Sequence, residues 1–109
     1  MVMTDVRTVA ANATSANVLG GKIAEFLNEN SVLRLYATGA AVGMFCTMLV
    51  GDSTLIDDQE ISGINRFPIK PDDLVDEGAG FEKDRIILRF RNTTGAGIVV
   101  KSRMEIEPL

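Results

Sequence analysis

The strongest constraint on the fold is a regular alternation of side chains in the last quarter of the chain. In residues 84–91, and again in residues 98–107, one face is mostly apolar and the other is mostly charged. The apolar members are Ile86, Leu88, Phe90, Ile98, Val100, Met104 and Ile106. A period of two is typical of an antiparallel β-sheet with one buried and one solvated face. The glycine-containing segment 92–97 between the two runs predicts a hairpin with a long loop.

Shorter strand patterns recur along the rest of the chain at intervals of about 8 to 12 residues. They lie at residues 18–19, 22–27, 31–38, 42–50, 54–61 and, beside Pro68 and Pro71, 64–69. Residues 71–80 predict a long acidic loop instead. This spacing is typical of sandwiches and barrels. We therefore expect an all-β fold, a single antiparallel β-sandwich or jelly roll of about eight short strands.

The chain of 109 residues is long enough for one hydrophobic core and too short for two. We expect a single domain over residues 1–109, in which residues 1–16 form an edge strand or a short extended N-terminal arm. The longest apolar run, residues 40–50, is about half the length that crosses a membrane as a helix. The first residues do not follow the pattern of a secretory signal, so we expect synthesis in the cytoplasm and no membrane partner.

Composition narrows the possible chemistry. The net charge of −4 argues against a nucleic-acid partner, because phosphate binding requires a basic surface. The chain has no histidine and one cysteine, which excludes histidine-based catalysis and a structural zinc site. Cys46 lies in an apolar run and is expected to be a buried, inert thiol. We expect no enzymatic activity, no catalytic, cofactor-binding or metal-binding residues, and no cofactor.

Two alternatives remain open at this point. The first is a calcium site among the acidic residues 72–77, since calcium prefers carboxylate oxygens. The second is a small carbohydrate- or receptor-binding module with Tyr36, Phe67 and Phe81 as contacts. Glycosidase chemistry is disfavoured, because adjacent acids in a strand face opposite sides and the chain has no tryptophan to line a sugar cleft.

An interface with other proteins is the remaining expectation. Residues 42–50 are apolar on both faces, which predicts a central strand or one covered by another subunit. Basic side chains near the C-terminus are expected to share the outward face of the predicted hairpin, where they could pair with the acidic loops of a second copy. The candidate interface residues are Val42, Met44, Phe45, Met48, Arg89, Arg91, Lys101 and Arg103.

The order of residues along most of the chain resembles that of small β-sandwich or jelly-roll proteins that decorate, or cement, the capsids of tailed bacteriophages. The segments that carry the resemblance include Asn17-Val18-Leu19-Gly20-Gly21-Lys22, Val50-Gly51-Asp52, Pro71-Asp72-Asp73, Arg91-Asn92-Thr93-Thr94 and Ile106-Glu107-Pro108-Leu109. The resemblance implies a structural virion protein without enzymatic activity. Its expected partners are the major capsid protein and copies of itself, with a trimer favoured. A tail or vertex adaptor is the alternative within the same class.

Overall fold

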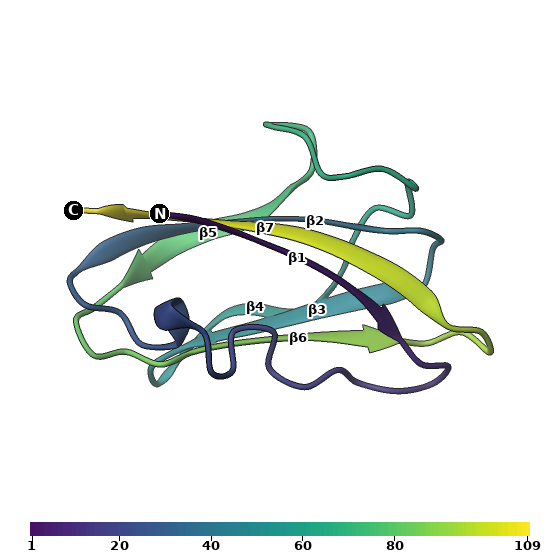
Figure 1. Ribbon diagram of the computed structural model, residues 1–109, viewed down its shortest axis with the longest axis horizontal. Coiled ribbons are helices and arrows are strands. Elements are labelled where there is room, and N and C mark those ends of the chain that lie inside the picture. The colour runs from purple at the N-terminus through teal and green to yellow at the C-terminus, as the bar shows by residue number, and fades with distance from the viewer.

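Seven strands and one short 3-10 helix make up the computed structural model, which describes residues 1–109 (Figure 1). The elements are β1 (Val2–Val9), η1 (Ile23–Glu25), β2 (Ser31–Gly39), β3 (Met44–Val50), β4 (Ser53–Glu60), β5 (Leu74–Gly80), β6 (Ile86–Asn92) and β7 (Ile98–Pro108). The strands form two antiparallel sheets, ordered β1-β7-β2-β5 and β4-β3-β6, which lie as two layers in Figure 1. No helix in the structure is suited to spanning a membrane.

An irregular segment, residues 13–18, runs along the free side of β6 and acts as an eighth strand. Ser15 N–H donates to Phe90 O at 2.8 Å and Val18 N–H to Leu88 O at 2.8 Å. The pairs are then nested along the chain: β1 pairs with β7, residues 13–18 pair with β6, β2 pairs with β5, and β3 pairs with β4. That nested pairing is the connectivity of a jelly roll, so the expected all-β sandwich is confirmed.

The core lies between the two sheets and follows from the alternation of the strands. In β3 and β6 every second residue is buried, and the intervening ones reach the outer surface. The apolar cluster contains 21 buried residues, and its largest fully buried side chain is Phe90. Removing such side chains from water contributes about 25 cal/mol per Å² of apolar surface, which is the main force that holds the two sheets together.

The predicted C-terminal hairpin is wrong, although both of its strands exist. β6 pairs with β3, whereas β7 pairs with β1 and β2 in the other sheet. Residues 93–97 therefore cross from one layer to the other. Alternation shows which side chains share a face of a strand, but it does not show which sheet the strand belongs to.

Other elements also differ from the expectation. Residues 22–27 contain η1 instead of a strand, and residues 64–69 form a loop. Residues 18–19 lie in the turn that begins where the segment along β6 ends. Residues 74–80, expected to be loop, form β5. The glycines that disfavour a strand here are required by packing, because a Cβ atom on Gly78 would overlap the Leu55 side chain. Residues 2–9 form the edge strand β1, which is one of the two forms expected for the N-terminal segment.

Residues 61–73, here called the covering loop, project above the β1-β7-β2-β5 sheet (Figure 1). The Lys70 ammonium lies 5.8 Å from the centre of the Tyr36 ring and 2.9 Å from the Glu105 carboxylate. Tyr36 and Glu105 are consequently buried, although both lie on the outer face of this sheet. The covering loop therefore shields the middle of that face from water.

Candidate functional site

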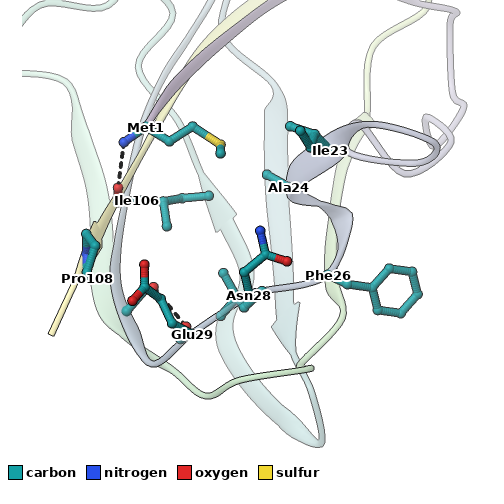
Figure 2. A pocket seen from close by; sticks show the side chains of 10 residues that line it. Met1, Ile23, Ala24, Phe26, Asn28, Glu29, Ile106 and Pro108 are labelled. Carbon is teal, nitrogen blue, oxygen red and sulfur yellow. Dashed lines mark hydrogen bonds between the residues drawn. The ribbon is translucent and has the colours of Figure 1, made fainter.

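Large apolar side chains are exposed at the end of the sandwich where the two chain termini lie (Figure 1). Met1, Ile23 and Phe26 are 56%, 77% and 53% exposed. They line a hollow of about 180 Å³ between η1 and the adjoining ends of the strands, shown in Figure 2. We call this hollow the terminal groove. Its lining residues are Met1, Ile23, Ala24, Phe26, Leu27, Asn28, Glu29, Ser31, Ile106 and Pro108.

The wall formed by η1 is held in place by one carboxylate. The Glu25 carboxylate accepts a hydrogen bond from Gly21 N–H at 2.9 Å and forms an ion pair with Arg85, whose Nε lies at 2.8 Å. These two donors, the Gly21 amide first, lower the pKa of Glu25 below its ordinary value. Gly21 adopts a φ of 74°, which glycine allows without strain. Because Ala24 points into the core, Ile23 remains outside.

The opposite wall is formed by the two chain ends. The amino group of Met1 donates to Ile106 O at 2.9 Å, and Ile106 N–H donates to Met1 O at 2.9 Å. Leu109 N–H donates to Asn30 O at 2.9 Å, which secures the last residue. In Figure 2 the side chains of Met1 and Ile106 extend toward η1, whereas the Phe26 ring points away from the hollow. The groove is thus a preformed feature with an aromatic side chain at its rim.

The groove offers mainly apolar contact. Its polar side chains belong to Asn28, Glu29 and Ser31, and the Ser31 hydroxyl already donates to Glu29 O at 3.0 Å. No group of three or more metal-binding side chains gathers anywhere in the structure. Concave surfaces with this lining are suited to an apolar side chain or peptide segment of a partner.

The structure separates the apolar candidate interface residues. Met44 and Met48 are fully buried in the core, so their expected place on an outer contact surface is wrong. The even-numbered side chains of β3 point between the sheets, so Met44 and Met48 are buried and Phe45 is partly exposed on the outer face. Val42 is 70% exposed, but it lies in the β2–β3 loop, at the opposite end of β2 from the terminal groove.

The basic candidates do not form one surface either. Arg89 and Arg91 lie on the outer face of the β4-β3-β6 sheet, while Lys101 and Arg103 lie on the outer face of the other sheet. The expected basic hairpin face is wrong because β6 and β7 belong to different layers. Arg91 is engaged within the chain by Asp58, with N–O distances of 3.1 and 2.7 Å.

The residues of the two open alternatives do not converge. Tyr36 is 4% exposed beneath the covering loop. Phe67 lies in the covering loop before β5, and Phe81 directly follows the other end of that strand. For calcium, the Asp73 carboxylate is already occupied by Arg66 at 3.1 and 3.2 Å. Neither a shared aromatic surface nor a cluster of free carboxylates results.

Sequence reasoning missed the terminal groove, although one signal was present. Ile23, Phe26 and Leu27 have helical spacing between a glycine pair and a polar segment. That spacing predicts a short helical turn, which η1 supplies, but it does not predict that Ile23 and Phe26 are exposed while Leu27 is buried. The contribution of Met1 and Ile106 depends on the pairing of β1 with β7, which no local pattern reveals.

No known protein family and no curated protein matches this chain in sequence. Among solved structures, the capsular polysaccharide assembling protein CapF from Staphylococcus aureus is similar, with a TM-score of 0.45 and 11% sequence identity. The match covers 97% of this chain and 24% of that protein. The chain therefore spans about a quarter of the length of CapF, and similarity at this level says nothing about function.

Proposed function

We propose that this protein is a structural component of a virus particle, a decoration or cement protein that binds the shell of the major capsid protein. The observation that carries the proposal is the set of exposed apolar side chains around the terminal groove. Ile23 and Phe26 are more than half exposed beside a preformed hollow. Contiguous apolar surface of this kind is typical of a site that another protein covers.

The fold and the residue order support this choice. Jelly rolls occur in viral capsid domains and in lectins, so the fold allows the proposed role without selecting it. The resemblance of the residue order to capsid decoration proteins favours the virion role. A protein of this kind is made in the host cytoplasm and then joins the particle.

The proposed mechanism is binding alone. The exposed apolar residues Ile23 and Phe26 enter depressions of the shell, and the hollow beside them accepts a side chain of the capsid protein. A few central apolar anchors usually supply most of the binding energy of an interface. Each copy then adds a small stabilisation, and the effect is repeated over the lattice.

Binding to shells that were assembled without this protein tests the proposal. Purified protein is mixed with such shells, the particles are sedimented through a density gradient, and both components are quantified by mass spectrometry. We expect co-sedimentation in a near-stoichiometric ratio to the shell protein. A tail or vertex adaptor would give a few copies per particle, and protein that stays in the soluble fraction would refute the virion role.

Two matched substitutions locate the contact. Ile23→Asp places a charge at the rim of the groove, and Val42→Asp places one at a similarly exposed position at the other end of the sandwich, since the two side chains are 77% and 70% exposed. We expect Ile23→Asp to weaken binding about tenfold or more, because burial of an unpaired charge is unfavourable. Val42→Asp should bind as the wild type does. Equal effects would show that the groove is not the contact surface.

A further inference from the structure

The four sheet edges of the sandwich differ in how they are protected. The edge of β6 is covered by residues 13–18, through three backbone hydrogen bonds. The edge strand β4 carries two register shifts against β3 and four acidic or amide side chains in succession. β5 lies beside β4, where Gln59 Nε2 donates to Val75 O at 3.5 Å. Bulges, charges and coverage of this kind are the usual protection against unwanted strand pairing.

The remaining edge, β1, has no bulge and no covering segment, and its only two charged side chains neutralise each other. It spans eight residues and pairs with β7 without a register shift. It contains no proline or lysine, and its outward side chains are Val2, Thr4, Val6 and Thr8, all of them exposed. Its charged residues Asp5 and Arg7 point to the inner face, where they bind each other at 2.6 and 3.0 Å. β1 is therefore a straight edge of strand-forming residues.

The hydrogen bonds of β1 show which backbone groups are free. Met1 and Ile106 exchange two backbone hydrogen bonds, both 2.9 Å long. In an antiparallel ladder such pairs alternate with pairs that share no bond. With the register unchanged, the odd-numbered residues of β1 bind β7, while Val2, Thr4, Val6 and Thr8 direct their N–H and C=O groups to the open edge. Four donors and four acceptors are thus presented at the spacing of a strand.

We propose that two copies of this chain join through their β1 strands, antiparallel, so that the two β1-β7-β2-β5 sheets become one continuous sheet. The open edge is self-complementary, because its four free residues are placed symmetrically about Asp5. Val2 then lies opposite Thr8 of the second copy, and Thr4 lies opposite Val6. All four are β-branched, and such residues are favourable in cross-strand pairs.

Asp5 is the residue that the two-fold axis would bring opposite itself. Its carboxylate is already compensated within each copy, by Arg7 at 2.6 Å and by Lys22 at 3.2 Å. The two copies therefore meet without an uncompensated pair of negative charges. A two-fold pair is a closed dimer, in place of the trimer expected from the resemblance. The inference does not depend on the virion role, since the terminal groove takes no part in the pairing.

The oligomeric state and the exchange of backbone amides test the dimer together. We expect light scattering after size-exclusion chromatography to show a dimer that dissociates on dilution. In the dimer, amide hydrogen exchange measured by NMR should be slow at Thr4, Val6 and Thr8, and dilution should speed it up. The amides of Met3, Asp5 and Arg7 should stay protected in both states, because they bind β7. A monomer at every concentration, with fast exchange at Val6, would overturn the proposal.

Substitutions at Val6 test whether the β1 edge, and no other surface, forms the dimer contact. Val6→Pro removes an N–H that the folded chain does not use, so the monomer should keep its circular dichroism spectrum while the dimer is lost. Val6→Lys should weaken dimerisation about tenfold or more, since an edge lysine opposes pairing. The control is Val42→Lys, at another exposed valine. If Val6→Lys dimerises as the wild type does, the contact lies elsewhere. If Val6→Pro does not fold, Val6→Lys alone shows whether the β1 edge forms the dimer.

Discussion

Asp73 lies buried at the base of the covering loop, where three hydrogen bonds reach its carboxylate. Arg66 donates from Nε at 3.2 Å and from Nη2 at 3.1 Å, and Ile69 N–H donates at 2.9 Å. Burial alone would raise the pKa of Asp73. The Arg66 guanidinium and the Ile69 amide together lower it by more than burial raises it, so the pKa lies below its ordinary value of 3.8. One carboxylate thus holds the backbone of this loop at Ile69 and neutralises the charge of Arg66.

We expect Asp73→Asn to destabilise the fold by about 1–3 kcal/mol, because the substitution removes the charge that holds Arg66 and replaces one acceptor oxygen of a buried side chain with an NH2 donor. Urea denaturation measures the change in the free energy of unfolding. Asp72→Asn is the matched control, since Asp72 is the exposed neighbour and should change stability by less than about 0.5 kcal/mol. Equal losses for the two variants would show that Asp73 does not organise the loop.

Among the connections between elements, the crossing from β6 to β7 depends on Asn92, which is 1% exposed. Its Nδ2 donates to Val9 O at 3.0 Å and to Ala96 O at 2.7 Å. Its Oδ1 accepts from Thr94 N–H at 2.9 Å and from the Thr94 hydroxyl at 2.8 Å. The side chain therefore ties the end of β6, the end of β1 and the crossing segment together.

Asn92→Ala should lower the free energy of unfolding by about 1–3 kcal/mol, since it leaves buried backbone groups without their partner. Thermal or urea unfolding followed by circular dichroism gives the value. Asn65→Ala, in the exposed covering loop, is the control and should be close to neutral. If both variants unfold like the wild type, the crossing is held by the sheets alone.

The strands β2, β3, β6 and β7 could be predicted because their core side chains alternate with outward ones. β4 buries only Ile56 and is predicted as a polar strand that follows the turn at residues 51–53. β5 could not, because its glycines and acids disfavour strands and it forms only through pairing with β2 and packing against Leu55. The crossing at residues 93–97 has the composition of a hairpin loop, and only the burial of Asn92 distinguishes it. The groove joins residues from both chain ends, so its assembly depends on topology rather than on local pattern.

Taken over the whole molecule, four carboxylates have their pKa lowered in the folded state, and one of them is Glu25 beside the terminal groove. Arg7 and Lys22 lower the pKa of Asp5 against the opposing effect of burial, and Asp73 behaves as described above. Lys70 first, and Arg103 second, lower the pKa of Glu105 below its ordinary value of 4.5. Because the unfolded chain binds protons more readily than the folded one at these groups, they stabilise the fold above their ordinary pKa values, and this contribution is lost as pH falls.

The free energy of unfolding should therefore be lower at about pH 3 than at about pH 7, with the decline beginning as pH approaches 4.5, the ordinary pKa of a glutamate. Glu105→Gln should reduce the difference between the two conditions, since it removes one of these four groups. Glu107→Gln, at an exposed carboxylate of the same strand, should have the smaller effect. Urea titrations at both pH values make the comparison, and an unchanged difference in Glu105→Gln would contradict this account.

The burial of Tyr36 beneath Lys70 has a spectroscopic consequence. The chain has no tryptophan and one tyrosine, so its ultraviolet emission comes from this ring and from weakly emitting phenylalanines. The ring sits on the outer face of its sheet and not in the core, and it is 4% exposed because the covering loop lies over it. Intrinsic fluorescence therefore reports the lifting of that loop, while circular dichroism reports the sheets, and a difference between the two unfolding curves would measure how independently the loop moves.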